Sequence, residues 1–367
     1  MELPVRFLDL RVTDENERRE LHDAFEGHLS SGNLILSDDG SEFESQFAAS
    51  VGRGQCVGVN CGTDALLLGV RMLNLPNGGH VITSPFSWIA SSTAIALNHL
   101  QPRFVDIDEN LQLNLDEVER ELTENSAKPV AILVPHLHGN VVDLSRLSSL
   151  RAKFGVKIIE DCAQAYGARD SAGRLAGTIG DISAFSFNPM KVLGALGDAG
   201  AIVFDDSRLV SRAKSLRHSG LAKSNSSLTE LSHNCRLDAL QASLLMVRLK
   251  YLNAKIARRR EIFSMYQDAF SGLLRSVTLS GFSSNHYCYQ TISDCRDDLK
   301  KWLEDRGVEV RIRHDFLIPD HPVFHGVDSR IPLARSLVSK TLCLPMHENL
   351  SDEQIAHVVS VTKSFFE

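Results

Sequence analysis

The sequence predicts an α/β protein whose central, mostly parallel sheet is covered by helices on both faces. Helical and extended patterns alternate through the first half of the chain. The extended segments are mainly apolar: residues 131–134 read Ala-Ile-Leu-Val, and residues 156–159 read Val-Lys-Ile-Ile. Strands with two apolar faces are typical of parallel sheets that carry helices on each side. Functional groups in such sheets gather at the carboxyl ends of the strands, which is where a site is expected.

The order of the elements follows from the same periodicity. Residues 14–29 have the apolar spacing of an amphipathic helix, with Asp14 at the N-cap position. Further helices are expected over residues 41–51, 63–73, 88–97, 115–122 and 144–154. Strands are expected over residues 56–59, 80–83, 103–106, 131–134 and 156–159.

The length of the chain predicts two domains. It has 367 residues, whereas one domain commonly has about 100–200. Hydrophobic residues make up 43% and charged residues 23%, an ordinary globular usage that excludes wholesale disorder. We expect a large domain over residues 1–250 and a smaller C-terminal α+β domain over residues 251–367. A long helical pattern, residues 237–270, is expected to carry the chain from one to the other.

Charge and hydropathy argue against several classes of partner. The 39 Lys and Arg residues and 46 Asp and Glu residues give a net charge of −7, which argues against nucleic acid or an anionic membrane. No stretch approaches the ~18 apolar residues of a membrane helix. The first residues lack a basic segment followed by an apolar run, so no signal peptide is expected.

Cysteine usage predicts a reducing, cytoplasmic location. The seven cysteines are odd in number and no pair has C-x-x-C spacing, so neither a disulfide framework nor a zinc site is expected. Asp106 and Asp108 end a predicted strand and could bind a metal, but a solvated turn is the commoner structure for such a pair. No metal is therefore expected.

Three segments place polar groups directly after a predicted strand. The first, residues 60–66, reads Asn-Cys-Gly-Thr-Asp-Ala-Leu and turns from a strand into a helix. Free backbone N–H groups at such a helix start, together with a hydroxyl, form a site for a phosphate or another anion. The alternative is an ordinary helix cap by Thr63 or Asn60.

The other two segments contain an acid pair and a lysine. Residues 158–164 place Glu160 and Asp161 after an apolar strand, where a buried carboxylate needs a cationic or donor partner. A cap or a salt bridge is the alternative there. Residues 185–191 place Lys191 in an apolar stretch that glycines follow. A lysine amine held among apolar groups can act as a nucleophile, the alternative being a surface lysine whose stem covers apolar area.

Together the three segments predict the cofactor pyridoxal 5′-phosphate (PLP). PLP requires a phosphate cradle, a lysine that forms a Schiff base, and an acid that keeps the pyridine nitrogen protonated. The helix start supplies the cradle, and the second and third segments supply the acid and the lysine. Each feature alone is common, and their combination is much more specific.

With these residues in view, the sequence resembles the DegT/DnrJ/StrS family of PLP-dependent sugar aminotransferases, which have fold type I of PLP-dependent transferases. The resemblance runs along nearly the whole chain. The motifs that carry it are GTDAL (62–66), PFSW (85–88), FVDID (104–108), HLHG (136–139), EDCAQA (160–165), GD (180–181), FSF (185–187), PMK (189–191), NCR (234–236), QA (241–242) and LPMH (344–347).

The resemblance implies a role for each matching position, with Lys191 and Asp161 as the catalytic residues. Lys191 would be the Schiff-base lysine and would move a proton between Cα of the amino donor and the cofactor. Asp161 would pair with the pyridine nitrogen, and Gln164 would bond the phenolic oxygen. Trp88 would lie on the ring face, its alternative being an aromatic of the core.

The resemblance also implies a homodimer with shared active sites. Asn234 matches a residue that reaches the cofactor phosphate from the neighbouring subunit, whereas the remaining phosphate contacts would come from Gly62, Thr63 and Ser186. Substrate contacts are expected from Arg236, which could meet the anionic part of a nucleotide-sugar, and from His136.

Some positions depart from the family pattern. LRHSG (216–220) stands where the family usually has LRNHG, and SHNCR (232–236) stands near the common GxNYR. His138 replaces a frequent tyrosine, and residues 280–289 form a short segment. Because these positions belong to the expected acceptor and dimer regions, they bear on the substrate rather than on the cofactor.

The activity that the resemblance implies is transfer of an amino group from L-glutamate to a keto-sugar, most often nucleotide-linked, in amino-sugar biosynthesis. A keto-cyclitol or a keto-sugar phosphate in natural-product biosynthesis is the alternative acceptor. A sugar dehydratase branch of the family carries histidine in place of the lysine, so Lys191 favours transamination. Intact Lys191 and Asp161 also argue against a non-catalytic regulatory paralogue.

Overall fold

The computed structural model describes residues 4–125, 127–222, 227–327 and 329–367. Within these ranges one eight-stranded sheet has the order β1-β7-β6-β5-β4-β2-β3-β10. β7 runs antiparallel to both of its neighbours, and the other pairs are parallel. The strands are β1 (Gln55–Val59), β2 (His80–Thr83), β3 (Gln101–Val105), β4 (Ala131–Pro135), β5 (Lys157–Asp161), β6 (Ile182–Ser186), β7 (Gly200–Phe204) and β10 (Ser329–Arg330). The predicted α/β fold with a mostly parallel sheet is confirmed.

Helices cover both faces of this sheet, as the two-sided apolar strands predict. In β4, Ile132 and Val134 pack into one core cluster, while Ala131 and Leu133 pack into the other. One face is covered by α3 (Gly62–Met72), α4 (Ala90–Ala96) and α7 (Val210–Arg217). The opposite face is covered by α2 (Asp38–Val51), α5 (Leu115–Glu124), α6 (Leu144–Phe154) and the first part of α8 (Ala239–Phe270).

A second, antiparallel sheet is built from the last third of the chain. Its strands have the order β11-β9-β8 and are β8 (Arg275–Ser276), β9 (Tyr289–Ile292) and β11 (Thr341–Leu344). It shares a core with α9 (Arg296–Glu304), α11 (Asp352–Phe366) and the end of α8. Val5, near the start of the chain, packs into the same core and pairs with Val308.

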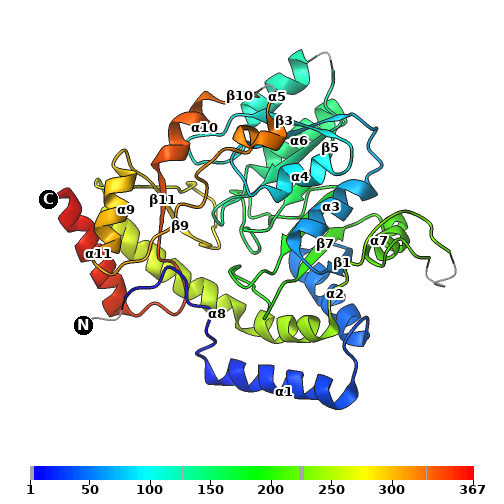
Figure 1. Ribbon diagram of the computed structural model, residues 1–367, viewed down its shortest axis with the longest axis horizontal. Helices are drawn as coiled ribbons and strands as arrows, with labels where there is room; N and C mark the ends of the chain where they lie inside the picture. The colour runs from blue at the N-terminus through cyan, green and yellow to red at the C-terminus, as the bar shows by residue number, and fades with distance from the viewer. Residues whose placement is uncertain (1–3, 126, 223–226, 328) are drawn as a thin grey trace.

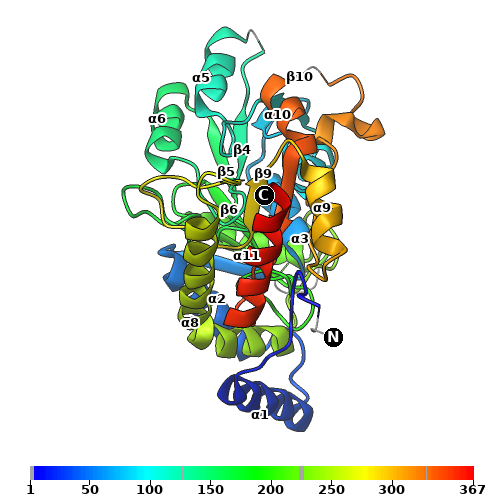
Figure 2. The ribbon, with the colours of Figure 1, turned by 90° about the vertical axis from the view of Figure 1, so that its left-hand side faces the viewer.

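α8 connects the two sheets as one continuous helix of 32 residues (Figures 1 and 2). Leu245 and Leu252 pack in the core of the large sheet, whereas Tyr266 and Phe270 pack in the core of the small one. α1 (Glu15–Ser31) packs along α8, and Asp14 caps it as predicted by accepting the N–H of Glu17. The remaining helical elements are α10 (Pro332–Leu337) and the 3₁₀ turns Ser207–Leu209, Ile318–Asp320, Pro322–Phe324 and Val338–Lys340.

Most predicted elements lie within a few residues of the observed ones. α4 begins at Ala90 instead of residue 88, so Trp88 precedes the helix. Asp106, considered as a metal ligand, instead accepts the backbone N–H groups of Leu333 and Ala334 at the start of α10. The division of the chain at residue 250 stays a prediction. No helix among the described residues has the length and apolar character needed to cross a membrane.

The end of β5 directs its two carboxylates to different faces of the sheet, because successive strand residues alternate. Glu160 is fully buried on the face that bears the 177–180 turn. Its oxygens accept hydrogen bonds from His136 Nε2, from Ser183 Oγ and from the backbone N–H groups of Gly177, Ile179 and Gly180. Burial alone would raise the pKa of Glu160, but these donors outweigh it and lower the pKa. Glu160 therefore anchors the strand end that carries Asp161.

Replacing Glu160 by glutamine tests this anchor. Glu160→Gln replaces one acceptor oxygen by an NH₂ group that faces buried donors. We therefore expect the free energy of unfolding to fall by about 1–3 kcal/mol. Glu26→Gln on the exposed surface of α1 serves as the control, with an expected change within about 0.5 kcal/mol. Equal stability of the two variants in urea denaturation would contradict the anchoring role.

Candidate active site

A cavity of about 530 Å³ lies at the carboxyl ends of the strands of the large sheet. The residues that follow β1, β2, β4, β5 and β6 line it from one side. Glu309, residues 311–314, Tyr287 and the N-terminal residues Phe7 and Leu8 line it from the other. All three polar segments singled out in the sequence therefore meet in one place. The predicted residues that line the cavity are Gly62, Thr63, Trp88, His136, Asp161, Gln164, Ser186 and Lys191.

The start of α3 forms a cradle in which there is no room for a larger residue. A Cβ atom on Gly62 would lie 2.6 Å from Cβ of Ser186, and one on Gly200 would lie 2.5 Å from the carbonyl carbon of Cys61. The N–H groups of Gly62 and Thr63 belong to the first turn of α3, where the helix offers them no carbonyl partner. Such a turn suits the phosphate of PLP.

The cap of α3 is different from the one considered in the sequence. Cys61 Sγ accepts the N–H of Asp64 at 3.4 Å, so the cap is neither Asn60 nor Thr63. The interpretation of Thr63 or Asn60 as the capping side chain is therefore wrong. Capping by the thiol leaves Thr63 as a cavity-lining side chain.

Asp161 is a buried carboxylate with a cavity in front of it. Its side chain accepts the hydroxyl of Ser91 at 2.7 Å and the N–H of Ala163 at 3.1 Å. Ser91 is held in turn by Ser87 at 2.9 Å. These donors are neutral, and no cation among the described residues forms an ion pair with Asp161. A buried carboxylate without a cation fits a protonated pyridine nitrogen, which would supply the missing charge.

Lys191 lies on the other side of the cavity against a phenol. Its Nζ donates to the hydroxyl of Tyr287 at 3.4 Å and lies 4.9 Å from the centroid of that ring. The guanidinium of Arg313 donates to the same hydroxyl and lies 4.5 Å from the same ring. The surroundings of Lys191 are thus more polar than the apolar stretch in the sequence predicts. The lysine lines the cavity, unlike the surface lysine considered as the alternative.

Trp88 and Gln164 complete the walls of the cavity. Trp88 is 64% exposed, so it is not an aromatic of the core. Gln164 Oε1 accepts the N–H of His138 at 2.8 Å, which orients the NH₂ end of the amide as the donor. Both placements fit the contacts that the resemblance implies for a ring face and a phenolic oxygen.

His136 is held by contacts inside the protein. Its Nδ1 accepts the N–H of Val142, and its Nε2 bonds Glu160 at 3.0 Å, so the hydrogen lies on Nε2. Both ring nitrogens are therefore occupied within the protein, and the substrate contact expected of His136 stays a prediction.

Asn234 and Arg236 lie outside the cavity of their own chain. Asn234 is exposed, and its backbone pairs with that of His218. Arg236 is half-buried and contacts Nδ1 of His218 at 3.4 Å. The structure therefore does not bring them together with the other predicted residues, and their roles across a subunit boundary stay predictions.

The sequence reasoning missed the residues that close the cavity from the second sheet, Tyr287, Arg311, Arg313 and His314. The signal was the RIRH sequence at 311–314, in which two arginines alternate with an apolar residue. Burial, and then the charges of His138, Arg313 and Lys191, lower the pKa of His314 to about 3.

Comparison with known proteins agrees with this geometry. The sequence profile of the DegT/DnrJ/EryC1/StrS aminotransferase family matches residues 15–363. The chain belongs to this family. It is 34% identical, over 95% of both chains, to a dTDP-3-amino-3,4,6-trideoxy-alpha-D-glucose transaminase of Micromonospora megalomicea subsp. nigra. It is 32% identical, over 98% of this chain and 97% of the relative, to a UDP-N-acetyl-3-dehydro-alpha-D-glucosamine 3-aminotransferase of Acidithiobacillus ferrooxidans.

Solved structures of the DegT family have the same fold. The crystal structure of DesV from S. venezuelae superimposes with a TM-score of 0.93 at 31% identity, covering 100% of this chain and 99% of DesV. The resemblance, the fold class and the assignment as a PLP-dependent transaminase are confirmed.

The packing around Gly62 predicts the effect of one methyl group. Gly62→Ala pushes Ser186 away from the cradle, and overpacking of this kind costs about 1–3 kcal/mol. We expect the affinity for PLP to fall by about 10–100-fold, measured by absorbance titration. Gly27→Ala in α1 is the matched control, since a Cβ atom there meets nothing within 4 Å. Unchanged PLP affinity in Gly62→Ala would contradict the assignment of the cradle.

The depressed pKa of His314 predicts a dependence of stability on pH. The unfolded chain binds a proton at His314 near pH 6.5, whereas the folded chain does so only near pH 3. Between these values the unfolded state binds more protons, so stability falls as the pH falls, by up to about 1.4 kcal/mol per pH unit.

His314→Gln removes this contribution and should make the dependence shallower below about pH 6.5. The comparison is urea denaturation at several pH values, with exposed His22→Gln as the control. Parallel pH profiles of wild type and His314→Gln would contradict the prediction, because they would mean that His314 titrates alike in the folded and unfolded chains.

Proposed function

We propose that this transaminase moves an amino group from L-glutamate to the keto group of a nucleotide-linked sugar. One observation carries the proposal. Three features line a single cavity: the buried carboxylate of Asp161, which has no ion pair among the described residues, the amine of Lys191, and the N-terminus of α3. Each of the three is needed for PLP chemistry, and the fold brings them together from separate strands.

The residues that would hold PLP follow from their chemistry. Gly62, Thr63 and Ser186 would take the phosphate, and Asp161 would take the protonated ring nitrogen. When bound, PLP supplies an electron sink for the pair of electrons left on the donor carbon. Gln164 and Trp88 would bind the phenolic oxygen and a ring face.

Lys191 is the proposed base of the reaction. Its amine would take the proton from Cα of the amino donor and return a proton later in the cycle. Tyr287 would hold this amine in place, because its hydroxyl accepts from Lys191 while Arg313 fixes the phenol from the other side. Phe7 and Leu8, which line the cavity, would help to exclude water.

Two arginines in the cavity support anionic substrates. Arg311 and Arg313 line it, and guanidinium groups suit both the carboxylates of glutamate and the diphosphate of a nucleotide. The relatives named above act on dTDP- and UDP-linked sugars, which supports a nucleotide-linked acceptor here. A keto-cyclitol or a keto-sugar phosphate is the alternative acceptor.

We further propose a cytoplasmic homodimer. Asn234 is exposed and lies outside its own cavity, which suits a residue that serves the site of a neighbouring subunit. The seven cysteines are free, which suits a reducing compartment. Asn234 and Arg236 are the residues proposed to act across the subunit boundary.

The test follows nitrogen from donor to acceptor. Purified protein with PLP is incubated with ¹⁵N-labelled L-glutamate and, in separate reactions, nucleotide-linked keto-sugars, a keto-cyclitol and a keto-sugar phosphate. Mass spectrometry is expected to detect ¹⁵N in the nucleotide-sugar. Label in the cyclitol or sugar phosphate alone would favour the alternative acceptor. Loss of water without label would indicate a dehydratase, and no product at all would favour a regulatory protein.

Asp161→Asn keeps the shape of the side chain and removes its charge. We expect the rate of ¹⁵N transfer to fall by about 100-fold or more, because the ring nitrogen loses its counter-charge. Asp23→Asn on the exposed face of α1 is the control and should keep the wild-type rate. A wild-type rate in Asp161→Asn would contradict the role given to this carboxylate.

A further inference from the structure

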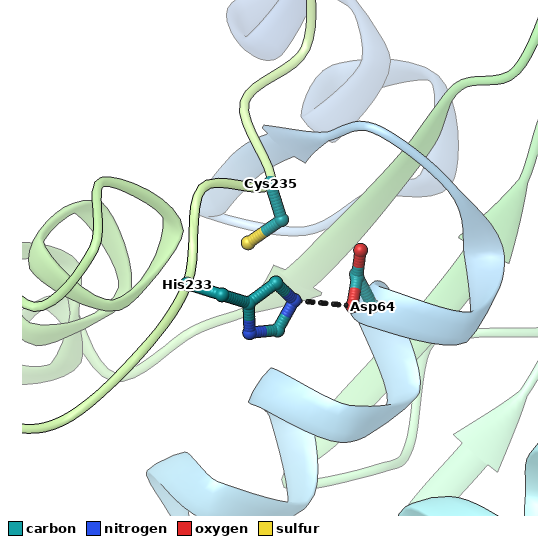
Figure 3. A group of neighbouring side chains, drawn as sticks. All are labelled: Asp64, His233 and Cys235. Atoms are coloured by element: carbon teal, nitrogen blue, oxygen red, sulfur yellow. Dashed lines mark hydrogen bonds and ion pairs between the residues drawn. The ribbon is translucent and has the colours of Figure 1, made fainter.

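A cluster of three metal-binding side chains lies outside the transaminase machinery (Figure 3). Asp64 belongs to the first turn of α3, whereas His233 and Cys235 belong to the segment that leads into α8. His233 Nε2 bonds Asp64 Oδ1 at 2.8 Å. The candidate ligand atoms of all three lie within 4.8 Å of one another. Figure 3 shows the three side chains directed toward one another.

The spacing of these atoms is close to that of a tetrahedral zinc site. Ligand bonds of about 2.0–2.3 Å place neighbouring ligand atoms roughly 3.3–3.8 Å apart. His233 Nε2 and Asp64 Oδ1 are 2.8 Å apart, and none of the three candidate ligand atoms is more than 4.8 Å from another. Shifts of about 1 Å would therefore bring the three atoms to the spacing of a zinc site. A thiolate, an imidazole and a carboxylate are also the ligand types that Zn²⁺ takes.

We propose that Asp64, His233 and Cys235 bind one Zn²⁺ ion, with a solvent molecule in the fourth position. The thiolate and the carboxylate together balance the charge of the ion. The side chain of His233 is 47% exposed, which gives the ion a route from solvent. The side chain of Asp64 is 13% exposed and Cys235 is buried, so the remaining ligands are sheltered.

The thiol of Cys235 is protonated without a metal. Burial, and then the neighbouring carboxylate of Asp64 and the thiol of Cys61, raise its pKa to about 12, although Arg217 and Arg71 act in the opposite direction. In this state it donates a long hydrogen bond, 3.7 Å, to the carbonyl oxygen of Arg217. Binding of Zn²⁺ displaces the proton and replaces that weak contact.

A second group of similar composition serves as a contrast. His136, Glu160 and Cys162 also lie close together, but all three are buried. The oxygens of Glu160 already accept three backbone N–H groups, and both nitrogens of His136 are bonded. A cation there would break several buried hydrogen bonds, so the partly exposed cluster is the better site.

The position of the ion would tie two regions of the site together. Asp64 follows Gly62 and Thr63 of the cradle, and His233 and Cys235 flank Asn234. Zn²⁺ would therefore fix the segment that carries Asn234 against the start of α3. This consequence for the active site rests on the proposed function, whereas binding of the ion does not.

The sequence predicts no zinc site, because the three proposed ligands come together only in the fold. Asp64 and His233 are 169 residues apart, so no local ligand spacing links them. Cys235 stands in the SHNCR segment, near where the family commonly has the tyrosine of GxNYR. The expectation that the cysteines suggest no zinc site is revised by this proposal.

The test is a titration of the PLP-bound, metal-free protein with Zn²⁺ alone, followed by competition with a chromophoric chelator. We expect one ion per chain and an increase in melting temperature. Cys295→Ser, which removes an exposed thiol outside the cluster, should bind like wild type. Loss of an outer-shell partner lowers metal affinity by about 10–100-fold, so His233→Ala and Cys235→Ser should lose at least that much.

Co²⁺ provides a spectroscopic check that a merely structural change would not mimic. Wild type and Cys295→Ser should show the visible bands of a tetrahedral cobalt–thiolate site, and Cys235→Ser should not. His233 is exposed, so His233→Ala is expected to fold, which circular dichroism and PLP content verify. Equal zinc affinity in wild type, His233→Ala and Cys235→Ser would overturn the proposal, as would a failure to bind stoichiometric Zn²⁺.

Discussion

The site depends on one buried carboxylate that has no cationic partner among the residues the structure describes. Asp161 ends β5 behind the cavity, with neutral donors from Ser91 and Ala163 on its two oxygens. Burial of such a charge is costly unless a cation completes it. In the proposed site the protonated ring of PLP would supply that cation. The strand order and the neighbouring Glu160 hold this carboxylate at the wall of the cavity.

Residues next to the second sheet close the cavity that lies at the strand ends of the first sheet. Tyr287 comes just before β9, and Arg313 comes from the connection between α9 and α10. Tyr287 contacts both Arg313 and Lys191, so the proposed base is held from the side of the second sheet. α8 packs in the cores of both sheets and connects them. The contact between Lys191 and Tyr287 therefore depends on how the two sheets are held together.

Sequence reasoning found the parts of the site that follow a strand locally. Gly62, Asp161 and Lys191 each lie just after an apolar run, and parallel strands bring such ends to one edge of the sheet. It did not find Tyr287 or Arg313, because their approach depends on how the two sheets pack. The cap of α3 was also missed, since Cys61 is a weaker acceptor than the neighbouring Asn60 and Thr63. The strand β10 has two residues, too few for any periodicity.

Lys191 and Asp161 are proposed to make this cavity the site of the glutamate half-reaction. The absorption spectrum of the PLP-bound protein, recorded before and after addition of L-glutamate, tests these roles. We expect a band near ~420 nm that shifts to ~330 nm in wild type and not in Lys191→Ala. Lys153→Ala, on the exposed face of α6, should behave as wild type does. Two results would contradict the proposed roles. One is bound PLP whose spectrum does not change when glutamate is added, and the other is an equal shift in Lys191→Ala.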